Sequence, residues 1–326
     1  MFLPRVLFVI PGPEQGPSMI FAKRLVPALR ELGVTVETFY LASRSSPSIL
    51  LSEWGRFREV ERAFKPALVH AQFGTMTGFF TVLASRSPLV VTFRGSDLNP
   101  TPSMNSLRTA VGRILSQVAA LRARRVICVS NQLRSRLFWK GRYTTVVPTG
   151  VDTKLFRPMD LASARRALGW PPDDRVILFN AGRSPEVKRL DLARAAVDAL
   201  QQRLANARML VLDGSVEAAS IPLLMNACDC LLVTSDWEGS PTVIQEAIAC
   251  GLPVISVNVG DVRERLAGLV GSRIVARRAS DLAQALQHAV GTPHQVPSED
   301  RLGEISLHAV AQRTLAVYND ALRGVS

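Results

Sequence analysis

Short apolar runs rich in β-branched residues alternate along the chain with longer segments whose apolar residues recur at helical spacing. In residues 18–32 the apolar positions 21, 25, 28, 29 and 32 form one helical stripe, which Gly33 ends. Strand–helix alternation of this kind predicts parallel, doubly wound sheets. Six strands are expected in the first half of the chain, over residues 5–10, 35–41, 67–71, 89–93, 125–130 and 144–147, and five in the second, over residues 175–180, 208–213, 230–235, 253–257 and 272–276.

A turn-rich segment separates the two strand-bearing halves. Residues 146–160, VVPTGVDTKLFRPMD, contain Pro148, Gly150 and Pro158 and are predicted as a linker. The length of 326 residues also exceeds the size at which a single core usually stops growing. We therefore expect an α/β chain of two doubly wound, Rossmann-like lobes facing across a cleft. The expected domains are residues 1–148 and 149–305, with a ligand at the carboxyl ends of the strands.

The N-terminal residues MFLPRVLFVIPGP contain a six-residue apolar run that ends in a Pro-Gly turn, which predicts a buried strand rather than a secretory leader. No apolar segment approaches the roughly 20 residues that span a bilayer. The four cysteines, at positions 128, 228, 230 and 250, lie in apolar runs and are expected to be buried, reduced thiols. We expect a cytoplasmic protein, soluble or attached peripherally to the inner face of the membrane.

Positive charge is concentrated in the first half of the chain. Residues 1–150 hold 20 Lys and Arg against 7 Asp and Glu, whereas residues 151–326 hold 19 against 20. The asymmetry favours an anionic partner for the first half, such as phosphates or an acidic membrane surface, with a solvated helix face as the alternative. Nucleic acid is not expected, because aromatic residues do not interleave with the basic segment 108–125 and no zinc-finger, homeodomain or RNP pattern occurs.

Residues 236–251, DWEGSPTVIQEAIACG, place Glu238 and Glu246 eight positions apart in an otherwise apolar stretch. The stretch follows a predicted strand and begins a helix, with Ser240 as the expected N-cap and Pro241 at the first helical position. Backbone N–H groups from Gly239 through Val243, with Ser240 and Thr242 between them, suit a phosphate. The two carboxylates suit sugar hydroxyls on either side of it. The alternative is a loop glutamate followed by a solvated helix glutamate.

The segment EGSPTVIQEAIACGLPVISVNVGDVRE resembles the sugar-donor signature of retaining family-four (group 1) glycosyltransferases, which have the two-lobe GT-B fold. GVDTKLFRP resembles the family's linker, NAGRSPEVKRLDL its Arg-and-Lys phosphate segment, and VVTFRGSDL the end of an acceptor-lobe strand. HAVAQRTLAVYNDAL resembles the closing helix, which would complete the N-terminal domain over about residues 306–326. The resemblance implies acceptor binding by residues 1–148 and nucleotide-sugar binding by residues 149–305.

By matching position, the resemblance also implies individual roles. Arg183 and Lys188 would hold the diphosphate and stabilise the leaving group, so that neither a metal nor another cofactor is expected. Glu238 would bind hydroxyls of the donor sugar, and Glu246 those of the ribose. Gly16, in the loop GPEQGPS, would let the backbone approach the nucleotide-sugar.

The chain departs from the family pattern at the positions to which catalysis is credited. Many members carry a histidine where this chain has Arg94, in TFRGSD. Many also have two histidines where this chain has His70 and Gln72. His70, Arg94 and Asp97 are the catalytic candidates. For His70 a satisfied structural histidine is the alternative, and Asp97 either pairs with Arg94 or ends a turn.

These observations favour a glycosyltransferase that moves a sugar from a nucleotide-sugar to a glycan or lipid-linked acceptor, in surface polysaccharide or glycolipid synthesis. A nicotinamide dehydrogenase is disfavoured, because VIPGPEQG is not the G-x-G-x-x-G motif. Two alternatives remain: a nucleotide-sugar epimerase, and a non-catalytic partner that binds nucleotide-sugar or polysaccharide.

Overall fold

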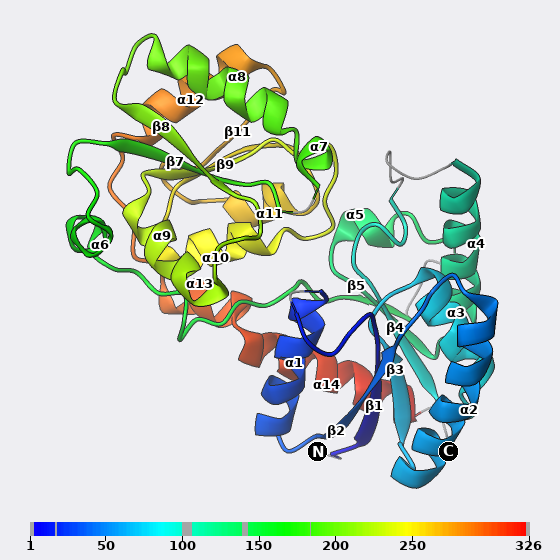
Figure 1. The fold of residues 1–326 in the computed structure, drawn as a ribbon. Helices are drawn as coiled ribbons and strands as arrows, with labels where there is room; N and C mark the ends of the chain where they lie inside the picture. The colour runs from blue at the N-terminus through cyan, green and yellow to red at the C-terminus, as the bar shows by residue number, and fades with distance from the viewer. Residues whose placement is uncertain (1–2, 17, 100–105, 139–142, 183, 324–326) are drawn as a thin grey trace. The chain divides into compact units, whose positions relative to one another are not determined.

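The chain forms two compact units in a computed structural model, which describes all residues except 1–2, 17, 100–105, 139–142, 183 and 324–326 (Figure 1). Unit 1 comprises residues 1–150 and 307–326, and unit 2 comprises residues 151–306. Each unit is built around one fully parallel sheet, with helices connecting the strands. The predicted α/β class with two doubly wound lobes is confirmed.

The sheet of unit 1 has six strands in the order β2-β1-β3-β4-β5-β6. All six predicted runs form strands, and two of them have the predicted bounds. The strands are β1 (Arg5–Pro11), β2 (Thr35–Leu41), β3 (Leu68–Ala71), β4 (Leu89–Phe93), β5 (Arg125–Cys128) and β6 (Thr144–Val146). The order reverses at β1, which pairs with both β2 and β3, as in other doubly wound sheets.

Two hydrophobic cores cover the two faces of this sheet. Alternate residues of β1 point to opposite faces, so Val6, Phe8 and Ile10 join one core while Leu7 and Val9 join the other. The first core includes residues of α1 and α14, and the second includes residues of α2, α3 and α4. The helices of unit 1 are α1 (Ile20–Glu31), α2 (Pro47–Phe64), α3 (Thr75–Ala84), α4 (Ser106–Arg122), α5 (Asn131–Arg134) and α14 (Leu307–Arg323).

Unit 2 has five strands in the order β11-β10-β9-β7-β8. The strands are β7 (Arg175–Asn180), β8 (Ala207–Leu212), β9 (Cys230–Val233), β10 (Val254–Val257) and β11 (Arg273–Val275). The helices are α6 (Leu161–Leu168), α7 (Pro185–Lys188), α8 (Leu190–Gln201), η1 (Ala218–Ser220), α9 (Ile221–Ala227), α10 (Thr242–Cys250), α11 (Val262–Leu266), α12 (Ala279–Ala289) and α13 (Glu299–Ile305). Every residue of β9 and β10 is buried, as strands covered on both faces require.

The chain passes between the units at two adjacent points. The backbone N–H of Val151 donates to the carbonyl of Ile305 at 2.9 Å, and Val151 bridges to Ser306. A Cβ added to the neighbouring Gly150 would lie only 3.0 Å from the Cα of Leu307. The two segments approach so closely here that position 150 favours glycine. Among the described residues, no helix is both long enough and apolar enough to cross a bilayer.

Candidate functional site

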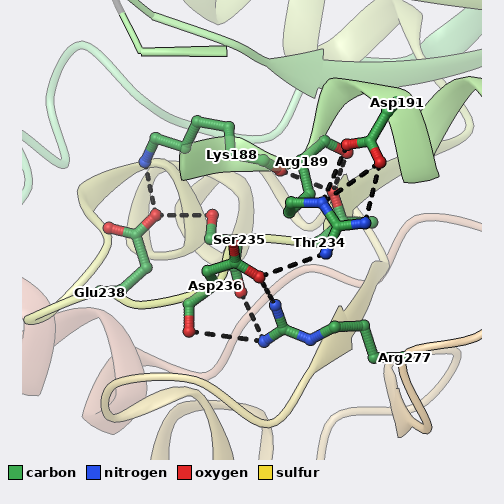
Figure 2. Close-up of polar contacts among 8 residues, drawn as sticks. All are labelled: Lys188, Arg189, Asp191, Thr234, Ser235, Asp236, Glu238 and Arg277. Atoms are coloured by element: carbon green, nitrogen blue, oxygen red, sulfur yellow. Dashed lines mark hydrogen bonds and ion pairs between the residues drawn. The ribbon is translucent and has the colours of Figure 1, made fainter. Parts of the chain in front are cut away.

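The turn after β9 holds Glu238 in an ion pair with Lys188, which is the last residue of the short helix α7 (Figure 2). The hydroxyl of Ser235 donates to the same carboxylate oxygen at 2.8 Å. Both charged side chains are mostly buried, with exposed fractions of 25% for Lys188 and 13% for Glu238. Strand ends of one parallel sheet bring the two predicted residues together, because α7 follows β7 and the turn follows the neighbouring β9.

A second charged cluster lies beside this pair and was not predicted. Arg189 donates to both carboxylate oxygens of Asp191 and also to Asp236, at 3.4 Å. Arg277 pairs with Asp236 and donates to the carbonyl of Ser235 at 2.8 Å. Figure 2 shows both guanidinium groups converging on Asp236. The sequence feature that could have indicated this cluster is Asp236, the first residue of the stretch that contains Glu238.

The side chain of Thr234 ties the two charged segments together. Its hydroxyl donates to the carbonyl of Lys188 at 2.7 Å and lies 3.0 Å from that of Arg189. The backbone N–H of Asp236 also donates to the carbonyl of Val187 at 2.9 Å. The α7 segment and the turn after β9 are therefore held as one piece, although about fifty residues separate them in sequence.

The helix after this turn begins one residue later than predicted. The expected N-cap at Ser240 is wrong: α10 begins at Thr242, and Pro241 takes the N-cap position without a side-chain bond. The physical reason is a competing partner, because the Ser240 hydroxyl donates to the buried carboxylate of Asp261 at 2.8 Å. Gln245 in turn donates to that hydroxyl at 3.2 Å.

The first turn of α10 nevertheless has the properties of an anion site. The N–H groups at the start of a helix have no carbonyl partner within the helix and carry the positive end of its dipole. Val243 is buried, so any contact it makes with a ligand is through its backbone. Glu246 is half-buried and lies four residues after Thr242, on the same face of the helix. Gly239 is buried in the turn before the helix.

Arg183, expected to hold the diphosphate with Lys188, lies outside the described residues. Gly16 is in unit 1, in the loop between β1 and α1, with a φ of +87° that favours glycine. Its carbonyl accepts a hydrogen bond from Nζ of Lys23 at 3.0 Å, and a Cβ added there would meet no atom within 4 Å. Within the ranges that the structure describes, no three His, Cys, Asp or Glu side chains gather as metal ligands.

The catalytic candidates of unit 1 form a buried network around His70. One guanidinium nitrogen of Arg94 donates to Oε1 of Gln72 at 2.5 Å, which fixes the orientation of the amide because arginine only donates. The amide nitrogen therefore faces Nδ1 of His70, at 2.9 Å, and donates to it. Nδ1 also lies 2.6 Å from the hydroxyl of Tyr318, on α14. The imidazole proton is then on Nε2, which donates to Thr92 at 2.7 Å.

This network keeps His70 neutral. Burial, and secondly the charge of Arg94, lower the pKa of His70 well below its usual range. Burial also lowers the pKa of the Arg94 guanidinium, to about 10, while Asp97 opposes that shift. Because His70 is fully buried and both its nitrogens have partners, its surroundings are those of a structural histidine.

Asp97 does not bind the Arg94 guanidinium. Its carboxylate accepts backbone N–H groups from Arg94, Gly95 and Gly74, at 2.9, 2.8 and 3.2 Å. The Arg94 side chain extends instead toward Gln72 and lies over the ring of Phe21, 4.3 Å from its centroid. Burial raises the pKa of Asp97 while the backbone hydrogen bonds oppose the shift. Of the two sequence alternatives, the structure has the one in which Asp97 ends the turn.

Comparison with protein families gives a match for each half of the chain. Residues 11–155 match the model described as Glycosyltransferase Family 4, and residues 174–291 match Glycosyl transferases group 1. The second match contains Lys188, Glu238 and Glu246. The two models occur in the order that the sequence motifs predict.

Curated relatives are similar over part of their length. A D-inositol 3-phosphate glycosyltransferase of Segniliparus rotundus is 30% identical over 55% of this chain and 47% of the relative. A teichuronic acid biosynthesis glycosyltransferase of Bacillus subtilis, TuaC, is 26% identical over 69% of this chain and 62% of the relative. The matched region thus spans about half to three fifths of the length of these relatives.

Solved structures share the fold over nearly the whole chain. A sucrose-phosphate synthase from Thermosynechococcus elongatus superposes with a TM-score of 0.79 at 18% identity, covering 99% of this chain and 100% of the other. HepE of Anabaena, solved with UDP and glucose, gives 0.73 at 18% identity and coverages of 97% and 100%. A UDP-GlcNAc 2-epimerase from Methanocaldococcus jannaschii gives 0.60 at 13% identity and coverages of 96% and 99%.

The fold alone is therefore shared by transferases and epimerases, whereas the sequence matches distinguish between them. Both family models describe glycosyltransferases, and together they account for the two halves and the turn that holds Glu238. The chain belongs to the family-four, group 1 glycosyltransferases.

Proposed function

We propose that this protein transfers a sugar, with retention at the anomeric carbon, from a nucleotide-sugar to a glycan or lipid-linked acceptor in surface polysaccharide or glycolipid synthesis. The observation that carries the proposal is the Lys188–Glu238 pair beside the first turn of α10, within the group 1 region. The relatives named for inositol phosphate and teichuronic acid glycosyl transfer support it. So does the likeness to HepE, which was solved with UDP and glucose.

The chemistry of unit 2 suits a nucleotide-sugar. A diphosphate bound near the start of α10 would take the Lys188 ammonium as its counter-ion and accept N–H groups from the helix start. Glu238, released from Lys188, would accept hydrogen bonds from hydroxyls of the sugar. Glu246, one helical turn after Thr242, would accept those of the ribose. Arg183 would add a second cation on the diphosphate, a role that rests on the family motif.

The residues of unit 1 favour a reaction without a strong protein base. His70 is neutral but enclosed, and the Asp97 carboxylate is occupied by backbone N–H groups. In the proposed step the bond from the anomeric carbon to the diphosphate oxygen breaks, and the acceptor hydroxyl oxygen bonds to the same face of that carbon. The acceptor proton goes to the departing diphosphate. Cationic side chains that stabilise the leaving group then supply the main catalytic effect.

We propose that the reaction needs no metal, because Lys188, Arg183 and the helix start supply the positive charge that a divalent cation supplies elsewhere. A chelator should leave the initial rate within about twofold. A rate that the chelator abolishes and added Mg²⁺ or Mn²⁺ restores would contradict this part of the proposal.

The basic first half supports a further proposal, that the protein works on the cytoplasmic side, peripherally at an anionic membrane surface. Residues 1–150 carry 20 Lys and Arg against 7 Asp and Glu. The four cysteines are buried and unpaired, as suits a reducing compartment. A lipid-linked acceptor would be encountered at such a surface.

Two other functions are consistent with particular observations. The fold is shared with a nucleotide-sugar 2-epimerase, and the side chain of Arg94, at the family's histidine position, is bound to Gln72. An epimerase would convert the bound nucleotide-sugar without any acceptor. A non-catalytic partner would bind it and turn nothing over.

The test is binding and slow hydrolysis across a panel of UDP-, GDP- and ADP-sugars, with wild type, Glu246→Gln and Arg183→Ala. Selective binding that weakens in both variants, with hydrolysis by the wild type, would support the transferase. A change of sugar configuration on the intact nucleotide would show an epimerase. Binding without turnover, even with lipid-linked acceptors, would show the non-catalytic partner, and no binding at all would overturn the proposal.

A further inference from the structure

Helix α4 of unit 1 exposes an apolar stripe. Leu107, Val111, Ile114 and Leu121 recur at helical spacing and have exposed fractions of 71%, 46%, 62% and 54%. The opposite face of the helix packs mainly against α3, with Ala119 buried. Figure 1 shows α4 beside α3 at the edge of unit 1. The exposed stripe is therefore additional to the face that holds the helix in the fold.

The stripe borders an open apolar groove. Ile114, Val118, Leu121 and Phe138 line a cavity of about 500 Å³ together with Ala110, Arg113 and Gln117. Phe138 lies after α5 and is 77% exposed. Scattered exposed aliphatic residues are common, but a contiguous patch of this kind marks an interaction surface.

Arginines follow the stripe along its length. Arg108, Arg113 and Arg122 are exposed and are chain neighbours of Leu107, Ile114 and Leu121 respectively. Over residues 98–151 the sequence contains nine Lys and Arg and no Asp or Glu. Alternation of aliphatic and guanidinium groups is unlike the core of a protein–protein interface, which is depleted of charge. It is typical of a helix that lies in the headgroup region of an anionic bilayer.

A second cavity, near the N-terminal part of α4, is lined by two arginines. Arg44 and Arg108 line this cavity of about 360 Å³, together with Phe73, Thr75 and Val111. The Arg44 guanidinium lies 5.7 Å from the centroid of the Phe73 ring. Burial, and secondly the charge of Arg108, lower the pKa of Arg44. Among the described residues neither arginine has a carboxylate partner, so two like charges share one cavity.

We propose that the exposed face of α4 docks on an anionic phospholipid bilayer. Leu107, Ile114 and Leu121 would enter the headgroup boundary, with their neighbouring arginines on lipid phosphates. The Arg44–Arg108 cavity would hold one headgroup phosphate. The inference deepens the proposed membrane-side function, because it names the helix and the residues through which the enzyme would reach a lipid-linked acceptor.

The experiment is sedimentation with phosphatidylcholine vesicles and with vesicles in which a third of the lipid is phosphatidylglycerol, at low and moderate salt. The wild type should bind the anionic vesicles at least tenfold more tightly, and less so at moderate salt. Ile114→Glu/Leu121→Glu should lose at least tenfold in binding. Arg44→Gln/Arg108→Gln should lose more than tenfold, since each arginine near the surface contributes about fivefold.

Matched controls are available in the same unit. Leu51→Glu changes an aliphatic side chain that is 76% exposed on α2, and Arg86→Gln changes an exposed arginine after α3. Both should bind like wild type. All variants have surface substitutions and should keep the wild-type unfolding transition, which is measured alongside.

The outcomes separate this inference from the proposed function. A wild type that binds nucleotide-sugar but not anionic vesicles would overturn the docking surface and leave the transferase standing. Variants of α4 that bind vesicles like wild type would overturn the assignment to this helix. Loss of self-association in Ile114→Glu/Leu121→Glu, without loss of vesicle binding, would assign the face to a second copy of the chain. If inorganic phosphate displaces the wild type from vesicles but does not displace Arg44→Gln/Arg108→Gln, the proposed role of the cavity would be supported.

Discussion

Lys188 and Glu238 are fifty positions apart in the chain and form an ion pair in unit 2, which the hydroxyl of Ser235 supports at 2.8 Å. Lys188 and Glu238 are each expected to bind a different part of one nucleotide-sugar, the diphosphate and the sugar respectively. In the absence of the ligand they neutralise each other, which avoids two uncompensated charges in a mostly buried site. Under the proposed function, binding of a nucleotide-sugar would be an exchange of partners, in which the diphosphate would replace Glu238 on Lys188.

This exchange predicts different ligand profiles for the two residues. Lys188→Met should weaken both the nucleotide-sugar and the free nucleoside diphosphate by roughly 10- to 100-fold, the usual effect of losing a charged hydrogen bond. Glu238→Gln should weaken only the nucleotide-sugar to that extent, because the nucleoside diphosphate has no sugar hydroxyls. The affinity of this variant for the nucleoside diphosphate should stay the same or rise, since Lys188 no longer has a competing carboxylate. Titration calorimetry with both ligands makes the comparison.

Exposed residues of unit 2 supply the controls, Lys154→Met and Glu217→Gln, which should leave both affinities unchanged. A Glu238→Gln variant that loses both ligands equally would contradict the division of roles. Equal losses in all four variants would indicate a general loss of structure.

Most of the fold could be predicted from local sequence patterns. Strands β2, β4 and β7 have the predicted bounds because each is a short run rich in β-branched and aromatic residues. The start of α10 was misjudged because Ser240 has the usual N-cap chemistry, whereas its actual partner, Asp261, is 21 positions further along. A cap is a local inference, and a long-range hydrogen bond overrides it.

The candidate site could be predicted in part. Glu238 was indicated by its place after a predicted strand and Lys188 by a family motif, but their pairing follows from the neighbouring positions of β7 and β9 in the sheet. Arg277 reaches Asp236 from 41 positions away, after β11, and has no motif of its own. The same limit applies to His70, because its partner Tyr318 is 248 positions away on the last helix.

The burial of His70 predicts a pH-dependent stability of unit 1. Its pKa is well below the usual range in the folded protein, by burial first and the charge of Arg94 second, and near about 6.5 in the unfolded chain. Below that pH the unfolded chain binds more protons, so the free energy of unfolding falls as the pH decreases. The loss is at most about 1.4 kcal/mol per pH unit for one histidine. Burial also lowers the pKa of His294, in unit 2, and its effect has the same sign.

Urea unfolding between about pH 7 and pH 5 measures this slope. His70→Asn should make it shallower, and His294→Asn should do so independently, because the two residues lie in different units. Arg94→Gln removes the second cause of the shift, so it should raise the pKa of His70 in the folded protein and end the steep region at a higher pH. A slope that His70→Asn leaves intact would show that this imidazole titrates in the folded state.

Removing one partner of the buried Arg165–Asp229 ion pair should destabilise unit 2 far more than removing one partner of a more exposed pair. The two groups are 2.7 Å apart and only 3% and 4% exposed, and the backbone N–H of Val176 also donates to Asp229, at 2.6 Å. Asp229→Ala leaves the arginine buried without its counter-charge and should cost about 3–5 kcal/mol. Asp174→Ala removes the partner of Arg208 in a more exposed pair, at 38% and 24%, and should cost less than about 1 kcal/mol. Chemical denaturation of both variants tests the contrast, and equal costs would contradict it.

Gly260 packs closely against the turn that carries Glu238, so a side chain added there should displace that turn. Its φ is +58°, and an added Cβ would lie 2.9 Å from the carbonyl oxygen of Gly239 and 3.2 Å from the Cβ of Glu238. Gly260→Ala must therefore shift this backbone, and nucleotide-sugar affinity should fall at least tenfold. Gly268→Ala is the matched control, because its φ of +77° carries a similar backbone cost of about 1–2 kcal/mol but nothing lies within 4 Å of the new Cβ. Both variants should lose similar stability from backbone strain, whereas only Gly260→Ala should lose ligand affinity. Equal affinities in the two variants would show that the position of Glu238 does not determine binding.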